Sequence, residues 1–241
     1  MNQPIHSLDA RYYTDPEVFA IEKTGLFART WQFACHLSDL PTAGCYTSFE
    51  IGGEALFAVR GRDHQVRVFY NVCQHRAHQL VSGAGRSPTI TCPYHAWSYD
   101  FDGALRAAPN LNVVTGADKS KICLTEVRCE EFLGFLFVNL DIEAAPMESW
   151  FPGVRAELEE WVPNWAVLKP LEWVEIPEKC NWKVSVENYS ECYHCSLNHM
   201  TFSNGVVKPE TYDIQPQGRC LRHITECQNL DSMSYDIRSG F

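Results

Sequence analysis

The chain has 241 residues, of which 45% are hydrophobic and 21% charged, a composition typical of soluble globular proteins. Its formal net charge of −10, from 20 basic and 30 acidic residues, excludes the basic surface of a nucleic-acid-binding domain. No apolar run approaches the roughly 18 residues of a membrane span, and the N-terminus lacks a secretory signal. We therefore expect a cytoplasmic protein whose 11 cysteines are mostly free thiols.

Residues 1–44 are predicted to form an N-terminal helical segment. Asp15 followed by Pro16 is a typical helix start, and apolar residues recur with roughly helical spacing as far as Phe33. The sequence therefore predicts a helix over residues 15–34 whose apolar side chains belong to the core.

Residues 45–145 are predicted to form a small all-β domain. Gly52 and Gly53 separate two strand-like runs, 46–51 and 55–59, which is typical of a β-hairpin. Further strands are predicted at 66–70, 89–91, 123–127 and 132–140. A scaffold of this kind can hold functional loops rigidly.

Residues 146–241 are predicted to contain a connector and part of a second domain, with the boundary between 141 and 152. Prolines punctuate the connector, and a helix with an apolar face is predicted over 148–161. A strand at 173–176 and a mainly helical segment over 181–199 follow.

Two short pairs of ligand-type residues dominate the predicted β domain. Cys73 and His75 form the first pair, and Cys92 and His95 form the second. Two cysteines and two histidines can hold a tetrahedral zinc ion or a Rieske [2Fe–2S] cluster, in which the cysteines bind one iron and the histidines the other. Zinc motifs typically pair like with like, whereas each loop here carries one residue of each kind, which favours the cluster.

A second pattern, E-x2-H-x4-H, is formed by Glu191, His194 and His199. In a helix, Glu191 and His194 would share one face, and His199 would follow at the helix end. Two imidazoles and a carboxylate are a usual ligand set for non-haem Fe(II), which leaves Glu191 open as a third ligand. A zinc hydrolase would use Glu191 as its base, but the H-E-x-x-H motif is absent.

The residues around both patterns resemble those of the Rieske non-haem iron oxygenases. The segments that are similar to the cluster loops of this family are Cys73-Gln74-His75-Arg76 and Cys92-Pro93-Tyr94-His95-Ala96-Trp97. The residues that match its N-x2-D/E-x2-H-x4-H pattern are Asn188, Glu191, His194 and His199. Ala77 and Ala96 stand where the family usually has glycine. The resemblance implies an α+β fold, with a small all-β Rieske domain followed by the first part of a helix-grip-like catalytic domain.

The resemblance also implies how these residues act. Both cysteine–histidine pairs would bind the [2Fe–2S] cluster, and His194 and His199 would bind a mononuclear Fe(II). Glu191 would not be an iron ligand, because in this family the acid at its position bridges to a cluster histidine of a neighbouring subunit and conducts electrons.

The third iron ligand of the family is an aspartate far downstream. The late aspartates Asp213, Asp231 and Asp236 come too early in the sequence to match it, so we expect an incomplete catalytic domain before Phe241.

Glu191, where ring-hydroxylating members usually carry aspartate, and Ala96 resemble the branch that acts on carnitine, glycine betaine, choline and stachydrine. We therefore expect an oxygenase (α) subunit that uses O2 to oxidise a small quaternary ammonium compound, by N-demethylation or C–N cleavage. The implied partners are a flavin/iron–sulfur reductase that supplies electrons from NAD(P)H, and two further copies in a homotrimer.

Three alternatives stay open at this point: an aromatic ring-hydroxylating dioxygenase α subunit, a Rieske electron-transfer module without oxygenase activity, and a zinc-binding interaction protein. The remaining cysteines, including Cys192 and Cys195, are predicted to be buried small hydrophobic residues. His36 and His223 are predicted to have structural or surface roles.

Overall fold

The computed structural model describes residues 7–113, 116 and 118–227, and these divide into two compact units. The unit that we call the sheet unit comprises Ala20–Pro146 and Ala166–Glu172. The mixed unit comprises Met147–Trp165 and, among the described residues, those up to Phe19 and those from Trp173 onward. In the part of the chain that the structure describes, no helix is long and apolar enough to cross a membrane.

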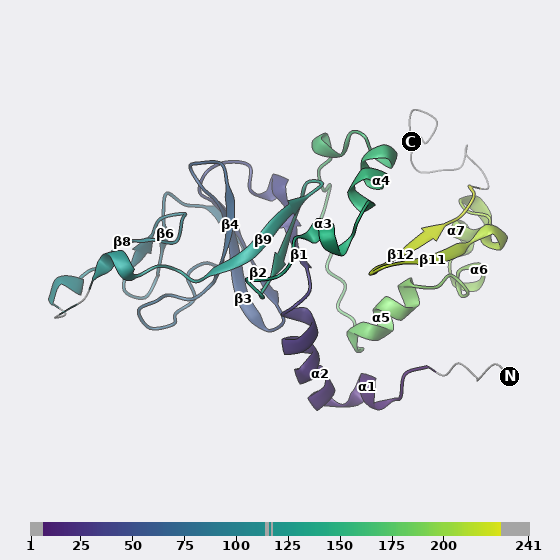
Figure 1. The fold of residues 1–241 in the computed structure, drawn as a ribbon, viewed down its shortest axis with the longest axis horizontal. Coiled ribbons are helices and arrows are strands. Elements are labelled where there is room, and N and C mark those ends of the chain that lie inside the picture. Colours follow the sequence, from purple (N-terminus) through teal and green to yellow (C-terminus); the bar gives the residue numbers. More distant parts are fainter. Residues whose placement is uncertain (1–6, 114–115, 117, 228–241) are drawn as a thin grey trace. The chain divides into compact units, whose positions relative to one another are not determined.

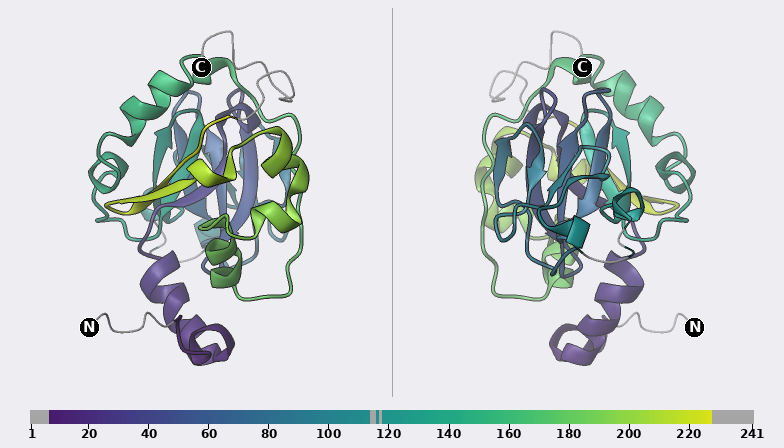
Figure 2. Two further views of the ribbon diagram at one scale, coloured as in Figure 1. Left: turned by 90° about the vertical axis from the view of Figure 1, so that its right-hand side faces the viewer. Right: turned by 90° about the vertical axis from the view of Figure 1, so that its left-hand side faces the viewer.

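The sheet unit is built from two antiparallel sheets, which can be followed in Figure 1 and Figure 2. The larger sheet has seven strands in the order β1-β10-β9-β4-β3-β2-β5, and the smaller has the order β6-β7-β8. The strands are β1 (Gln32–His36), β2 (Cys45–Ile51), β3 (Glu54–Arg60), β4 (Val66–Tyr70), β5 (Ala84–Arg86), β6 (Ile90–Thr91), β7 (Ser98–Tyr99), β8 (Leu105–Ala107), β9 (Glu126–Phe132) and β10 (Phe135–Asn139).

The interior strand β3 explains how the sheet unit supports a site. Successive side chains of a strand point to opposite faces. Phe57 and Val59 accordingly pack in one hydrophobic core, together with the cysteines of both predicted cluster loops, whereas Leu56 and Ala58 pack in the other. All four side chains are fully buried. The sheet is therefore covered on both faces, and one of its cores lies directly beneath the loops.

Two sequence predictions in the sheet unit are wrong in their bounds. The helix predicted over 15–34 ends earlier, as α2 (Pro16–Glu22) and a π-helical turn (Lys23–Phe27), because the chain then enters β1 and pairs with β10. The predicted strands 123–127 and 132–140 are instead β9 and β10, since the turn between them lies at Leu133 and Gly134, both with positive φ. The hairpin at Gly52-Gly53 is confirmed as β2 and β3.

The mixed unit consists of short helices and one hairpin. Its helices are α1 (Arg11–Thr14), α3 (Met147–Trp150), α4 (Val154–Trp161), α5 (Trp182–Tyr189), α6 (Cys195–Asn198) and α7 (Met200–Gly205), and its strands are β11 (Asp213–Gln217) and β12 (Cys220–Ile224). Five 3-10 turns complete the described structure: Leu37–Asp39, Leu111–Val113, Lys119–Lys121, Trp165–Val167 and Pro209–Thr211. The hairpin pairs in antiparallel register, with Ile214 opposite His223.

Three predictions fail in the mixed unit for local reasons. The helix predicted over 148–161 breaks where Pro152 precedes Gly153, whose φ is +80°. Residues 173–176 form no strand, because no neighbouring strand pairs with them. The helical segment predicted over 181–199 is interrupted between Tyr189 and Cys195.

The predicted N-terminal segment 1–44 is divided between the two units. The hydroxyl of Tyr13 donates to Glu187 Oε1 at 2.6 Å within the mixed unit. Trp31 Nε1 donates to the carbonyl of Ala145 at 3.2 Å within the sheet unit. The structure places the division at the end of the β domain between Pro146 and Met147.

Candidate functional site: two loops and a histidine pair

The first predicted cluster loop follows β4 directly and is closed by Asn71. The buried side chain of Asn71 accepts from the backbone N–H groups of Leu80 and Val81 at 3.0 and 3.1 Å, and it donates to the carbonyl of Val81 at 2.8 Å. Within the loop, the N–H of Cys73 donates to the carbonyl of His78 at 2.8 Å. Hydrogen bonds between protein atoms alone therefore join the two ends of the loop.

The second loop repeats the backbone pattern of the first. In the first loop the N–H of Ala77 donates to the carbonyl of Cys73 at 2.9 Å, and in the second the N–H of Ala96 donates to the carbonyl of Cys92 at 3.0 Å. Both alanines adopt the left-handed conformation, with φ of +54° and +58°. This conformation favours glycine, which explains why the family usually has glycine there.

The predicted cluster ligands of the two loops are two buried cysteines and two histidines whose rings lie close together. Cys73 and Cys92 are free thiols and almost fully buried, with 2% of each exposed. The ring centroids of His75 and His95 are 4.7 Å apart, and His75 stacks on Trp97 at 4.7 Å. His95 Nδ1 is buried and has no hydrogen-bond partner, as expected of an atom reserved for a metal.

The donor chemistry of the two loops fits a Rieske cluster. Partial desolvation, and then the charges of His75 and its neighbours, lowers the pKa of His95, which favours the neutral imidazole that binds a metal. No group of three or more candidate ligands converges on one ion in residues 7–113, 116 and 118–227. A Rieske cluster requires no such group, because each of its irons takes only two protein ligands.

A tyrosine hydroxyl also contacts the first loop. Tyr99 is fully buried, its Oη lies 3.3 Å from Cys73 Sγ, and it accepts a hydrogen bond from the N–H of Gln74 at 3.0 Å. The hydroxyl is therefore placed to donate to a sulfur ligand, and hydrogen bonds to the sulfurs tune such clusters. Sequence reasoning missed this role, although Tyr99 follows the second loop by only a few residues.

The second predicted site lies at the break between α5 and α6. Glu191 Oε1 contacts His194 Nδ1, Glu191 Oε2 accepts from the N–H of Tyr193, and the ring centroids of His194 and His199 are 5.1 Å apart. The hydrogen bond from His194 lowers the pKa of Glu191, which keeps it ionised. The prediction that Glu191 and His194 share one helix face is wrong. The two side chains meet across a turn between α5 and α6 instead.

Contact through Nδ1 leaves Nε2 of His194 free for a metal. Of the late aspartates, Asp213 begins β11, and Asp231 and Asp236 lie outside the described residues.

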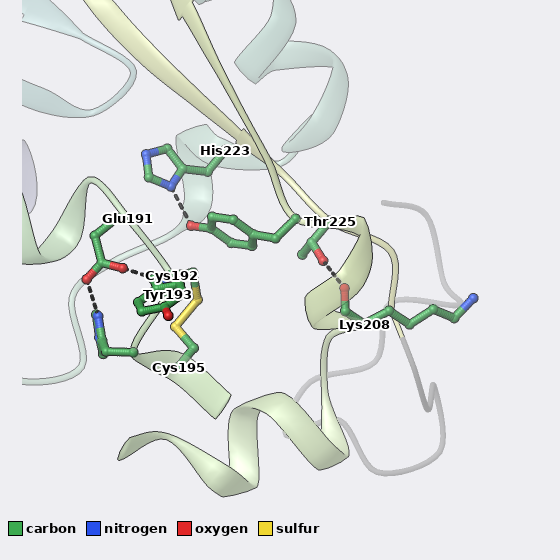
Figure 3. Close-up of a disulfide and its surroundings, with 9 residues drawn as sticks. Glu191, Cys192, Tyr193, Cys195, Lys208, His223 and Thr225 are labelled. Carbon is green, nitrogen blue, oxygen red and sulfur yellow. Dashed lines mark hydrogen bonds and ion pairs between the residues drawn. A yellow bond between two sulfur atoms is a disulfide. The ribbon is translucent and has the colours of Figure 1, made fainter. Parts of the chain in front are cut away.

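The cysteines near His194 correct a further prediction. Cys192 and Cys195 form a disulfide that closes a short loop around His194, as Figure 3 shows for the two cysteines beside Glu191. They are therefore not free thiols, and as a disulfide they provide no thiolate ligand. Cys123, Cys180 and Cys227 are exposed, so the expectation that the remaining cysteines are buried is also wrong for them.

A cavity of about 890 Å³ joins the histidine pair to residues that the sequence did not single out. Its lining includes Glu191, His194 and His199, and also Tyr212 and His223 of the β11–β12 hairpin. The hydroxyl of Tyr212 contacts Nδ1 of His223. The only signal in the sequence was the turn at Gly218 between two strand-length runs, which predicts a hairpin and says nothing about its target.

Comparison with known proteins identifies both units. Residues 30–118 match the model described as Rieske [2Fe-2S] domain, and residues 165–234 match the ring hydroxylating alpha subunit (catalytic domain). The first match contains both cysteine–histidine loops, and the second contains Glu191, His194 and His199.

Individual relatives point the same way. The carnitine monooxygenase oxygenase subunit of Escherichia coli (strain K12) is 44% identical over 205 residues, which cover 85% of this chain and 55% of that protein. The 2-aminobenzenesulfonate 2,3-dioxygenase subunit alpha of an Alcaligenes species is 34% identical over 211 residues, covering 86% and 53%.

A solved structure of a quaternary ammonium Rieske monooxygenase, described for carnitine oxidation by gut microbiota and inter-subunit electron transfer, matches with a TM-score of 0.83. It is 36% identical and covers 88% of this chain and 58% of that chain.

The chain thus spans about half the length of the curated relatives it matches. The two matched domains confirm the predicted α+β class and the predicted cofactors, a [2Fe–2S] cluster and a mononuclear iron. Because both domains, the relatives and the solved structure agree, the chain belongs to the Rieske non-haem iron oxygenases and contains the Rieske domain and part of the catalytic domain of their oxygenase subunit.

Proposed function

We propose that the complete protein is the oxygenase component of a two-component system that oxidises a small quaternary ammonium compound by N-demethylation or C–N cleavage. The observation that carries this proposal is the cavity beside His194 and His199, which is lined by aromatic rings and by the ionised Glu191. Similarity to the carnitine monooxygenase oxygenase subunit supports the same substrate class.

The geometry of the two sites supports the following assignment of cofactor ligands. Cys73 and Cys92 would bind one iron of the cluster, and His75 and His95 the other. His194 and His199 would bind the mononuclear iron. When bound, the cluster supplies electrons one at a time and the mononuclear iron activates dioxygen.

Glu191 is proposed to position His194 and to conduct electrons to it. Its Oε1 contacts Nδ1 of His194, which orients the imidazole and fixes its tautomer. About 42% of the Glu191 side chain is exposed, so the carboxylate is also accessible to a second group. We propose that this group is a cluster histidine of a neighbouring subunit in a homotrimer, because head-to-tail contacts can close into rings.

The aromatic residues of the cavity suit a cationic substrate. Tyr189, Phe202 and Tyr212 line it, and ring faces attract quaternary ammonium groups. Tyr193 is also close in sequence, but it is 95% exposed and does not line the cavity. The methyl groups of the substrate would then be held near His194 and His199.

The proposal is tested by oxygen uptake and product analysis with the complete protein and a flavin/iron–sulfur reductase supplied with NAD(P)H. L-Carnitine, glycine betaine and choline should give oxygen uptake with release of formaldehyde or trimethylamine. Activity confined to aromatic compounds such as 2-aminobenzenesulfonate would refute the substrate class and favour ring hydroxylation, the alternative that one relative supports.

Metal analysis separates the remaining alternatives. An oxygenase component should contain about three irons per complete chain, with two in the cluster, whereas an electron-transfer module should contain only about two. The reduced cluster should give an electron paramagnetic resonance signal. A colourless protein with stoichiometric zinc after anaerobic purification would contradict both iron proposals.

A further inference from the structure

The β11–β12 hairpin brings a second titratable pair into the cavity of the histidine site. Tyr212 immediately precedes β11 and His223 lies in β12, and both line the cavity together with His194 and His199. The hydroxyl of Tyr212 contacts Nδ1 of His223, whose position Figure 3 shows. Neither residue is among those to which we have assigned a cofactor.

The contact with Tyr212 defines which nitrogen of His223 is available. Burial, followed by the nearby Tyr189 and Glu191, raises the pKa of Tyr212, so its hydroxyl stays protonated and is able to donate. When Tyr212 donates to Nδ1, the proton of the imidazole is on Nε2. Nε2 then offers a donor to a molecule in the cavity. The ring of Tyr189, whose centroid is 5.7 Å from that of His223, flanks the imidazole.

The charged residues of the cavity lining indicate what this donor could bind. Its lining contains no lysine or arginine among the described residues, and its three imidazoles are His194, His199 and His223. His194 and His199 are assigned to iron, which leaves the imidazole of His223 to donate a hydrogen bond into the cavity. A zwitterionic substrate requires aromatic rings for its ammonium group and a donor for its carboxylate, and this cavity provides both.

We propose that Nε2 of His223 binds the carboxylate of a betaine-type substrate, and that Tyr212 is the positioning residue that holds the imidazole. This inference rests on the proposed function and adds a specificity to it. Zwitterions such as L-carnitine and glycine betaine use the anchor, whereas choline, which has a hydroxyl group in place of the carboxylate, does not.

The experiment compares L-carnitine with choline in the complete, iron-loaded protein. Binding is measured by anaerobic calorimetry and turnover by oxygen uptake. The variant His223→Leu should raise both Kd and KM for L-carnitine by about 10- to 100-fold, the effect of losing a hydrogen bond to a charged group. The same constants for choline should change by less than about twofold, since no carboxylate contact is lost.

Two further variants test the geometry. His223→Gln keeps an amide donor near the position of Nε2 and should restore part of the L-carnitine affinity. Tyr212→Phe keeps the ring but frees the imidazole, so it should weaken L-carnitine binding through KM rather than kcat. The control is Arg222→Gln, because Arg222 precedes His223 in β12 but pairs with Glu157 and does not line the cavity.

The outcomes separate the two proposals. Equal loss of affinity for L-carnitine and choline in His223→Leu, or no loss for either, would overturn the carboxylate anchor and leave the proposed function standing. If the unaltered protein neither bound nor oxidised any quaternary ammonium compound, the proposed function would fail, and the anchor with it.

Discussion

Replacing Tyr99 by phenylalanine removes one oxygen atom from the core beneath the cluster loops. The hydroxyl lies 3.3 Å from Cys73 Sγ and accepts from the N–H of Gln74 at 3.0 Å. Burial and the contact with Cys73 raise the pKa of Tyr99, so the hydroxyl stays protonated and donates toward the sulfur. The phenylalanine ring would keep the packing with Phe57 and Phe69 in the same core.

The expected effect is a lower reduction potential. A hydrogen bond to a sulfur ligand stabilises the reduced cluster more than the oxidised one, because reduction adds a negative charge. The net free energy of such a hydrogen bond is about 0.5–1.5 kcal/mol. For a one-electron couple, in which tenfold corresponds to about 59 mV, its loss lowers the potential by about 20–65 mV. The N–H of Gln74 also loses its acceptor, and because Gln74 is exposed to water this destabilises the fold by about 0.5–1.5 kcal/mol, the net value of one hydrogen bond.

The assay is a redox titration followed by electron paramagnetic resonance. Tyr70→Phe is the control, because Tyr70 lies in the same unit, ends β4 and contributes its hydroxyl-bearing side chain to the other core. Its potential should stay within about 10 mV of that of the unaltered protein, well below one hydrogen bond on the same scale. An unchanged or higher potential in Tyr99→Phe, with the cluster intact, would show that the hydroxyl does not donate to Cys73.

Three other experiments test the remaining features. Ala77→Gly and Ala96→Gly should each raise the free energy of unfolding by about 0.5–1 kcal/mol, because relief of left-handed strain exceeds the added entropy of glycine; a loss of stability in thermal unfolding would contradict the positive φ values. Glu191→Ala should keep both metals but leave the reduced cluster unoxidised when O2 and substrate are added, whereas Glu191→Asp should keep some transfer. Rapid, product-coupled reoxidation in Glu191→Ala would show another electron route. Alkylation under denaturing, metal-free, non-reducing conditions should leave Cys192 and Cys195 unmodified, and labelling of both would refute the disulfide.

Local signals in the sequence were sufficient to predict the first hairpin of the sheet unit. The hairpin at Gly52-Gly53 is set by its own turn residues, so it could be predicted without knowledge of the rest of the chain. The end of the first helix could not, because β1 is specified by pairing with β10, about 100 residues away, and Trp31 finds its partner at Ala145. An apolar run such as 31–35 suits a helix or a buried strand until that partner is known.

In the candidate site, too, the features set by neighbouring residues could be predicted and those set by distant pairing could not. The cysteine–histidine pairs and the E-x2-H-x4-H pattern are short-range features, so their spacing reveals the chemistry. Tyr212 and His223 enter the cavity only through the pairing of β11 with β12, and no spacing relates them to His194. The disulfide between Cys192 and Cys195 was equally hidden, since C-x2-C spacing suits thiols, a metal or a disulfide.

The hydrogen bonds of the Asn71 side chain bear on how the cluster is assembled. One amide side chain joins the two ends of the first loop through three hydrogen bonds, using only atoms of the protein. The conformational entropy of the loop is therefore lost during folding of the sheet and not when iron and sulfide arrive. The cluster is therefore expected to bind to a loop that is already ordered, in contrast to small zinc domains, which fold only when their metal binds.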